Sequence, residues 1–306
     1  MEINGVINIY KEEGFTSHDV VAKLRGILHQ KKIGHTGTLD PAARGVLPVC
    51  AGRGTRLCSL LTDHDKVYET VLLLGVVTDT QDMTGTVLET RPVHVTEGEI
   101  RECIRGFVGE QLQVPPMYSA KKINGKKLYE LAREGKTVER EAVPITIYDI
   151  EILEMKLPEI RLSIHCSKGT YIRTICNDIG EKLGCGGSMK TLLRTKVGEF
   201  LLKDAVTLET VEQYVQEGRI EELVTTPEMV FREAPAAKGL PAADKLLHNG
   251  NSIFQTMTEN TAMEAADGEQ FRMYDSRDVF IGLYQKKGEK LSPVKMFYQN
   301  DVTVSK

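Results

Sequence analysis

Polar and hydrophobic positions follow two different periods along the chain. Residues 66–74 and 160–167 alternate between apolar and polar side chains, which is typical of half-buried strands. In the first of these, Tyr68 and Thr70 fall on one face. Residues 17–29 instead carry apolar side chains at helical spacing behind a Thr-Ser pair that can cap a helix. Strands and helices alternate irregularly, so the pattern predicts a mixed α/β sheet and not a regular doubly wound one.

Two further helices carry capping signals. Thr96 and Glu99 form a capping-box pattern ahead of an apolar stripe. Thr170 is expected to cap a second helix, which ends at Gly184. Arg173 lies off the buried stripe of this helix and in its first turn, where the helix dipole disfavours a cation unless an anion is close. The residues alone leave two interpretations of Arg173 open: a solvated side chain or the partner of an acid.

The C-terminal third has a different pattern. An acidic helix is expected around residues 208–223, and the Pro-, Ala- and Gly-rich residues 232–245 are interpreted as a connection between domains. Beyond them the sequence predicts short strands, which suit a small β-barrel of about 65 residues. The four candidate strands cover residues 253–257, 271–275, 279–285 and 294–298.

Composition places the chain among globular proteins. It has 306 residues, 41% of them hydrophobic, and neither a membrane-spanning run nor a signal peptide at its start, so a cytoplasmic protein is expected. Six cysteines without a Cys-x-x-Cys pair indicate buried free thiols, and the histidines lack metal-binding spacing. The acids of TDTQDMTG at 78–85 lack the spacing of a calcium loop, so this segment is interpreted as an ordinary turn. We therefore expect no metal site.

Net charge argues against a uniformly basic surface, because the formal charge is −4 and the pI is about 6.0. Acids dominate residues 204–233, whereas lysines and arginines cluster elsewhere, so a local basic track is compatible with RNA binding. The densest cluster is KKINGKK at 121–127, whose four lysines surround an Asn-Gly turn and can grip phosphates with little sequence preference. Composition alone equally allows a solvated charged loop.

One acidic residue, Asp40, stands in the stiff segment GHTGTLDP at 34–41. An isolated Asp-Pro pair usually marks a turn. The string TGTL also resembles the phosphorylation loop DKTGTLT of P-type ATPases, but the phosphorylated aspartate would fall on Gly34 and the lysine on His35. We reject that interpretation because the acid follows the motif here and no membrane helix is predicted.

A much longer resemblance includes the same segment. GHTGTLDP, DKVYE at 65–69, PPMYSAKKINGKKLYELAREG at 115–135 and HCSKGTYIRTICNDIGEKLGCG at 165–186 resemble the TruB family of pseudouridine synthases, in the family's order. The chain departs from the family after Lys11, where the proline of a lysine-proline turn is missing, and at Arg44, which replaces a common threonine. These departures concern local rigidity and leave the acid in place.

The resemblance implies a fold and a reaction. The fold is α/β (α+β), a mixed, largely antiparallel sheet of the pseudouridine synthase type with flanking helices. The catalytic domain covers residues 1–235 with an RNA-binding insertion at 116–144, and a PUA-like RNA-binding β-barrel covers 236–306. The implied reaction is isomerisation of the T-loop uridine, uridine-55, of tRNA to pseudouridine, without a cofactor or metal. The partner is then the T-arm stem-loop of tRNA, with no membrane and no obligate protein partner.

The resemblance also implies roles for individual residues. Asp40 is the nucleophile and Arg173 its ion-pair partner, which would lower the pKa of the carboxyl; attack at ribose C1′ or base C6 stays open. His35 would fill the gap that the flipped-out uridine leaves. The residues implied to contact that uridine are Tyr68, Tyr171 and Leu192, and those implied to bind RNA are Lys11, Lys121, Lys122, Lys126, Lys127 and Arg194. Without the family, Tyr171 and Leu192 would be interpreted as core residues and His35 as a loop hydrogen-bonding group.

A rival hypothesis from a different class is a non-catalytic RNA-binding or tRNA-folding protein with the same surface. Binding residues would serve both hypotheses, but only catalysis requires Asp40 as a carboxylate. The Asp40→Asn variant therefore separates them.

Overall fold

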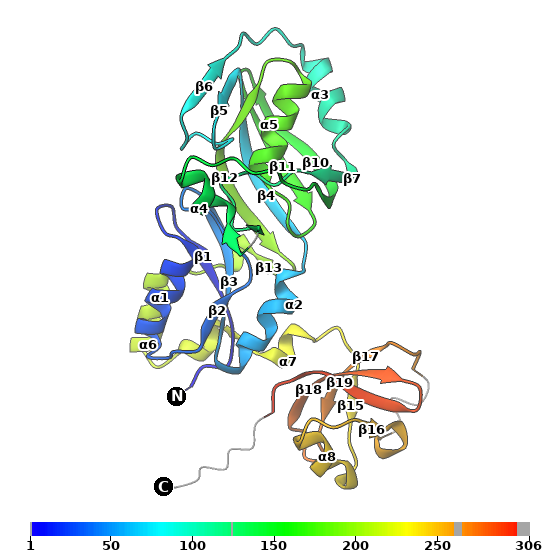
Figure 1. The fold of residues 1–306 in the computed structure, drawn as a ribbon. Coiled ribbons are helices and arrows are strands. Elements are labelled where there is room, and N and C mark those ends of the chain that lie inside the picture. Colours follow the sequence, from blue (N-terminus) through cyan, green and yellow to red (C-terminus); the bar gives the residue numbers. More distant parts are fainter. Residues whose placement is uncertain (1, 124, 260–264, 299–306) are drawn as a thin grey trace.

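The computed structural model describes residues 2–123, 125–259 and 265–298. Figure 1 shows an elongated N-terminal body built on one large sheet, with a smaller C-terminal sheet at one end of it. The larger sheet contains ten strands. They are β1 (Gly5–Lys11), β2 (Ile33–His35), β3 (Arg44–Ala51), β4 (Lys66–Leu74), β7 (Gly109–Gln113), β10 (Val143–Lys156), β11 (Glu159–Cys166), β12 (Gly187–Val197), β13 (Phe200–Leu201) and β14 (Val224–Thr225).

The strand order of this sheet is β14-β1-β3-β12-β4-β11-β10-β7, with β2 beside β3 and β13 beside β12. Strands β12 and β3 pair in parallel, and the other pairs are antiparallel. The predicted mixed, largely antiparallel sheet is confirmed. Strand β7 lies at one edge, which matters for the site because its last residue contacts the helix that carries Arg173.

Helices and two hairpins complete the N-terminal body. The hairpins pair β5 (Val76–Thr78) with β6 (Val87–Thr90) and β8 (Lys122–Ile123) with β9 (Lys126–Lys127). The α-helices are α1 (Ser17–Ile27), α2 (Cys58–Thr62), α3 (Glu97–Arg105), α4 (Leu128–Arg133), α5 (Ile172–Lys182), α6 (Leu208–Gln216) and α7 (Pro227–Val230).

The predicted strands and helix starts agree closely with the structure. Strand β4 covers the predicted residues 66–74 and buries every second residue, as alternation requires. Thr16 and Thr96 cap α1 and α3 with full capping boxes. The predicted cap of α5 is wrong by one position: Tyr171 is the N-cap, and the Thr170 hydroxyl donates to Ser167 O instead.

Two hydrophobic clusters hold the sheet and its helices together. Helices α1 and α6 lie side by side against β1 and β3, where Leu24, Leu47 and Val211 are buried in one cluster. Helices α3 and α5 pack near β4 and β11, and Leu72 and Ile175 are fully buried in the second cluster. This second cluster continues to the Asp40 loop, so the core itself positions the site.

The C-terminal sheet corrects one prediction. Residues 232–245 were expected to connect two domains, but they contain β15 (Ala236–Lys238) and the start of α8 (Asp244–His248). Apolar side chains of this stretch, such as those of Ala237 and Ala243, are buried in the C-terminal core. The other strands are β16 (Ile253–Phe254), β17 (Gln270–Tyr274), β18 (Phe280–Lys287) and β19 (Lys290–Met296).

The C-terminal sheet is consistent with the predicted small barrel. Its five strands follow the order β15-β17-β18-β19-β16. Main-chain hydrogen bonds join the two ends of this order, because Glu259 N donates to Lys238 O and Leu240 N donates to Met257 O, both at 2.8 Å. The loop after β19 attaches the sheet to the larger body. Arg56 Nη1 donates to Met296 O at 2.6 Å, and Phe297 is buried beside Leu57 and Leu61.

Three observations bear on the composition. All six cysteines are free thiols, and five of them are buried. Within residues 2–123, 125–259 and 265–298, no helix has the length and apolar character needed to cross a membrane. In the same ranges, no three His, Cys, Asp or Glu side chains gather in an arrangement that could hold a metal ion.

Candidate active site

Asp40 lies in the loop that joins β2 to β3. Leu39 directly before it is 3% exposed, and its backbone N–H donates to Ser17 Oγ at 2.9 Å. The Asp40 side chain is 42% exposed. The apolar neighbour therefore anchors the loop in the core, while the carboxylate remains partly accessible to solvent.

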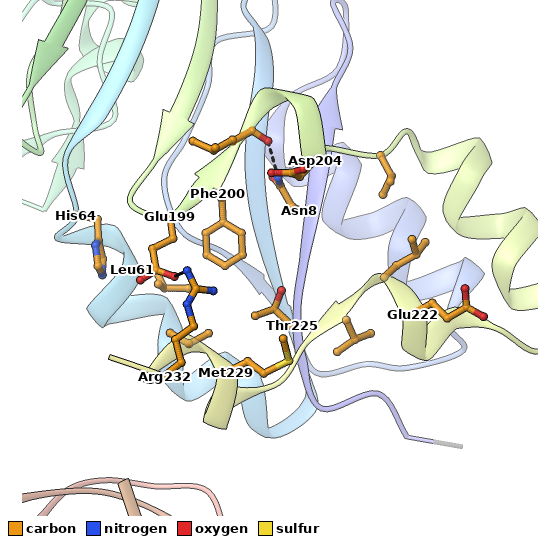
Figure 2. A pocket seen from close by; sticks show the side chains of 15 residues that line it. Asn8, Leu61, His64, Glu199, Phe200, Asp204, Glu222, Thr225, Met229 and Arg232 are labelled. Atoms are coloured by element: carbon orange, nitrogen blue, oxygen red, sulfur yellow. Dashed lines mark hydrogen bonds and ion pairs between the residues drawn. The ribbon is translucent and has the colours of Figure 1, made fainter. Parts of the chain in front are cut away.

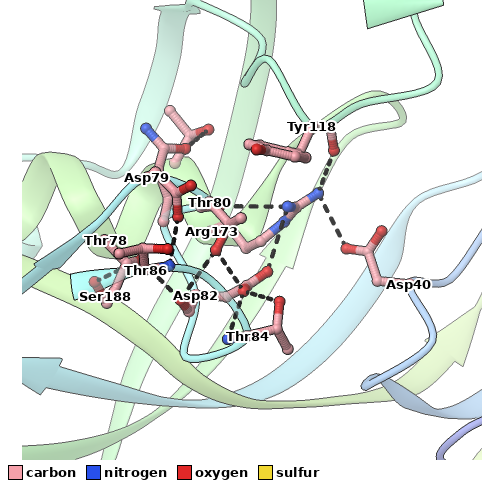
Figure 3. A network of polar contacts seen from close by, with 12 residues as sticks. Asp40, Thr78, Asp79, Thr80, Asp82, Thr84, Thr86, Tyr118, Arg173 and Ser188 are labelled. Carbon is pink, nitrogen blue, oxygen red and sulfur yellow. Dashed lines mark hydrogen bonds and ion pairs between the residues drawn. The ribbon is translucent and has the colours of Figure 1, made fainter. Parts of the chain in front are cut away.

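Arg173 connects the Asp40 loop to two other segments (Figure 3). Its Nη2 lies 3.1 Å from Asp40 Oδ2 and donates to Tyr118 O at 2.9 Å. Its Nη1 lies 3.3 Å from Asp82 Oδ2 and donates to Thr80 O at 3.3 Å. The Arg173 side chain is only 7% exposed. The interpretation of Arg173 as a solvated side chain is therefore wrong, and these anions explain how the first turn of α5 tolerates a cation.

The segment TDTQDMTG at 78–85 contains turns, as predicted, and its Asp82 also contacts Arg173. One carboxylate oxygen of Asp82 accepts from Thr80 Oγ1 at 2.8 Å and from Thr84 N at 2.9 Å, and the other faces Arg173. Both hydroxyl-bearing residues stand two positions from Asp82, and this symmetric pattern was a usable signal for a carboxylate fixed by its own turn. The spacing of a calcium loop is a different pattern, so the role of Asp82 was not predicted.

Opposing influences act on the pKa of Asp40. Removal from water raises the pKa and is the larger effect, while Arg173 and Lys11 lower it and Asp82 raises it. The net direction is upward, opposite to the one expected from Arg173 alone. Arg173 thus offsets part of the effect of burial and favours the ionised carboxyl.

A buried hydrophobic cluster includes side chains of the Asp40 loop. Tyr68 on β4, Leu192 on β12, and Leu39 and Ala43 of the Asp40 loop belong to one buried cluster. Burial raises the pKa of the Tyr68 hydroxyl, which keeps it protonated at neutral pH. The structure therefore brings Tyr68 and Leu192 together with the Asp40 loop, whereas Leu39 was not predicted.

Tyr171 and His35 lie close in sequence to the two members of the ion pair. Tyr171 is half-buried and precedes Arg173 by two residues. His35 ends β2; its Nδ1 accepts from Gly37 N at 3.3 Å, and its ring lies 5.3 Å from that of His18. Burial lowers the pKa of His35 to about 4, so its imidazole is neutral at physiological pH.

Lys11 and Arg194 do not lie on the surface, which corrects the expectation that both contact RNA. Lys11 is fully buried; its Nζ donates to Phe15 O at 2.6 Å and to Pro41 O at 3.3 Å. Arg194 is 1% exposed; it donates from Nε to Val46 O at 2.7 Å and from Nη2 to Gly37 O at 3.2 Å. The two cations thus hold the carbonyls on either side of Asp40.

The close approach of Arg194 on β12 to strand β3 depends on a glycine. Gly45 pairs with Arg194 where β3 and β12 run in parallel. A Cβ at Gly45 would lie 2.1 Å from Arg194 O, and its φ of +109° is unfavourable for other residues. Close strand packing at this point brings the guanidinium to the Asp40 loop.

The predicted basic insertion forms the β8–β9 hairpin followed by α4. Lys122 and Lys126 are exposed, whereas Lys121 and Lys127 are half-buried. Lys127 Nζ donates to Tyr129 Oη at 3.1 Å. Asn124, the first residue of the expected Asn-Gly turn, lies outside the described residues.

A separate cavity of about 370 Å³ lies between β1, α7 and the β12–β13 hairpin (Figure 2). Asn8, Phe200 and Met229 line it, and an ion pair of 2.9 Å joins Arg232 to Glu199 in its wall. None of the predicted site residues lines this cavity. It is therefore distinct from the Asp40 site.

Two family models and many curated relatives match this chain. The family model described as "TruB family pseudouridylate synthase (N terminal domain)" matches residues 25–172, and "tRNA pseudouridylate synthase B C-terminal domain" matches residues 173–231. The tRNA pseudouridine synthase B of Lachnoclostridium phytofermentans is 49% identical over 96% of this chain and 100% of its own length. That of Alkaliphilus oremlandii is 44% identical over 92% of each chain.

Solved structures share the fold. A crystal structure of a Cbf5-Nop10-Gar1 complex contains a chain that is 25% identical, with a TM-score of 0.73 over 97% of this chain and 86% of that one. A chain in an H/ACA RNP bound to a substrate RNA containing 2′-deoxyuridine gives a TM-score of 0.71 at 23% identity over 97% and 86%. The larger sheet and the C-terminal sheet both fall within these matches, which confirms the predicted fold class.

Proposed function

Because the chain belongs to the TruB family of pseudouridine synthases, isomerases that modify tRNA, we propose that its substrate is the T-loop uridine, uridine-55, of tRNA and that Asp40 is the nucleophile. The observation that carries the proposal is the 3.1 Å pair of Asp40 with a nearly buried Arg173. This pair holds an accessible carboxylate in one orientation. It also favours the ionised form that a nucleophile requires.

The proposed reaction is an internal exchange of bonds. The bond between N1 of uracil and ribose C1′ breaks, and a bond between C5 and C1′ forms. The proton on C5 is released and N1 regains one, so the product is an isomer and no outside group is transferred. Asp40 donates an electron pair to form a transient bond at C1′ or at C6, and this bond breaks again before the product leaves, so the carboxylate is regenerated.

The target uridine must leave the folded T-loop, which costs roughly a few kcal/mol of unstacking. We assign the compensating contacts to Tyr171 and to Tyr68 and Leu192, which belong to the same buried cluster as Leu39 directly before Asp40. Tyr68 is assigned to stacking on the base, because an aromatic ring offers a flat apolar face. Neutral His35 is assigned to the gap left in the loop.

The remaining contacts are proposed to bind the T-arm backbone. Lys121, Lys122, Lys126 and Lys127 lie on one short hairpin, from which exposed ammonium groups can reach phosphates. Residues 1–235 would form the catalytic domain and residues 236–306 a PUA-like domain that adds RNA contacts. We place this reaction in the cytoplasm.

Tritium release tests the substrate. A T-arm transcript labelled at C5 of every uridine should release one tritium per molecule with the wild-type protein. A matched transcript with cytidine at the T-loop target should release none, because no other uridine is positioned against Asp40. Equal release from both transcripts would assign the activity to a different uridine, and tight binding without release would favour the binding-only hypothesis.

The salt dependence of binding separates surface lysines from buried ones. We expect Lys122→Ala combined with Lys126→Ala to reduce the slope of log K against log salt by about 1.4–1.8, because each lost phosphate contact removes about 0.7–0.9. Lys11→Met should leave the slope unchanged, since its ammonium binds backbone carbonyls. Lys156, which is exposed on β10 with a side chain 79% accessible, provides the control variant Lys156→Ala. A reduced slope in Lys11→Met would contradict the structural role.

A further inference from the structure

Gln113 lies outside the groups that touch the substrate in the proposed reaction, but it binds the backbone just before Arg173. It is the last residue of the edge strand β7 and is 3% exposed. Its Nε2 donates to Tyr171 O at 3.1 Å, and its Oε1 accepts from Tyr171 N at 2.8 Å. Both polar ends of the buried carboxamide therefore bind one residue of the main chain.

Helix α5 depends on this contact at its start. Tyr171 is the N-cap, and its own side chain makes no capping hydrogen bond. Its carbonyl accepts the first helical bond, from Ile175 N at 3.2 Å. Gln113 supplies partners from outside the helix to the same residue, and a buried polar group left without a partner costs about 1–3 kcal/mol. The two hydrogen bonds between Gln113 and Tyr171 thus fix the position at which the helix begins.

The same stretch of chain reaches Arg173 a second time. Five residues after Gln113, Tyr118 O accepts from Arg173 Nη2 at 2.9 Å, and this nitrogen also faces Asp40 (Figure 3). Pro115 and Pro116 restrict the backbone between the two contacts. Residues 113–118 therefore hold both the backbone before Arg173 and its guanidinium.

We propose that Gln113 is a positioning residue for pseudouridine formation: its carboxamide sets the start of α5 and, through it, the placement of the Arg173 guanidinium against Asp40. The proposal rests on the proposed function, in which Asp40 is the nucleophile. A displacement of the guanidinium by a fraction of an ångström would weaken the pair without removing any group that touches RNA.

Gln111 offers a matched control. It lies on the same strand, and its Nε2 donates to Phe107 O at 2.6 Å, in the loop after α3. Phe107 lies near Lys182 at the C-terminal end of α5, so this contact does not involve the start of the helix. Gln113→Met should lower kcat roughly 10- to 100-fold with KM within about twofold of wild type, whereas Gln111→Met should stay within about threefold in kcat. The acid limb of the pH profile of kcat should move to higher pH in Gln113→Met only, because a displaced guanidinium lowers the pKa of Asp40 less.

Two further variants distinguish a positioning role of Gln113 from general destabilisation. Gln113→Glu keeps the acceptor for Tyr171 N–H and loses the donor, so an intermediate loss is expected; it carries the same test if Gln113→Met does not fold. In an Arg173→Lys background, adding Gln113→Met should lower kcat by less than about a further threefold. The guanidinium that Gln113 positions is already absent from this background. An additive loss with an unmoved acid limb would show general destabilisation and overturn the proposal, as would wild-type turnover.

Asp40→Asn assayed in parallel distinguishes the two failures. If Asp40→Asn turns over normally, the proposed function fails. If Asp40→Asn is inactive while Gln113→Met behaves as Gln111→Met does, only the role of Gln113 fails.

Discussion

The Asp40→Asn variant is expected to release no measurable tritium from the T-arm transcript, a loss of at least about 1,000-fold, because a neutral amide is not a nucleophile. RNA affinity should stay within about threefold of wild type, since the amide has nearly the same size. The rest of the network does not depend on this carboxylate. Arg173 keeps its contacts with Tyr118 O, Thr80 O and Asp82.

Asp79→Asn is the matched control for this experiment. Asp79 lies in the same turn as Asp82, but its Oδ1 accepts from Thr86 N at 2.7 Å, and its carboxylate is exposed. Its turnover should remain within about threefold of wild type, as for surface substitutions generally. Single-turnover release, filter binding and intact mass, which detects reversion of asparagine to aspartate, complete the measurement. Turnover by intact Asp40→Asn within tenfold of wild type would remove Asp40 from the role of nucleophile.

Local signals in the sequence were sufficient for elements whose residues interact with near neighbours. The capping boxes of Thr16 and Thr96 and the alternation of β4 each depend on a few consecutive residues. The prediction that residues 232–245 connect two domains was wrong because it also relied on local composition alone. The Pro, Ala and Gly residues of this stretch are typical of linkers, but small side chains are also what a tightly packed strand and helix start can bury.

The functional partners of Arg173 depend on contacts that no local pattern contains. Asp40 was identified by its motif, but Asp82 and the Tyr118 carbonyl approach Arg173 from segments 91 and 55 residues away. Burial of Lys11 also could not be predicted, because an ammonium is normally exposed and here three backbone carbonyls replace its water. Contacts of this kind can be identified only from the three-dimensional structure, because the fold sets their distances.

Arg173→Met is expected to lower turnover at pH 7 by at least about 100-fold and to destabilise the protein by about 3–5 kcal/mol. Both effects follow from the carboxylates left behind. The Asp82 side chain is 10% exposed and would lose the guanidinium at 3.3 Å, so a nearly buried charge remains without its cation. Asp40 would lose the group that fixes its orientation. Tritium release measures the loss of turnover, and urea unfolding measures the loss of stability.

The double variant Arg173→Met/Asp82→Asn separates stability from chemistry. Removing the second carboxylate should restore most of the lost stability, because burying an amide costs much less free energy than burying an unpaired charge, yet turnover should stay low.

The groups acting on the Asp40 carboxyl are Arg173 and Lys11, which lower its pKa, and Asp82, which raises it. In Arg173→Met the pKa of Asp40 therefore rises further, the acid limb of kcat moves to higher pH, and activity recovers partly as pH increases. In the double variant the limb should return part of the way, since the repulsion from Asp82 is gone as well. An acid limb that stays at its wild-type position in both variants would mean that Arg173 does not control the charge of Asp40, and that the pair serves the fold alone.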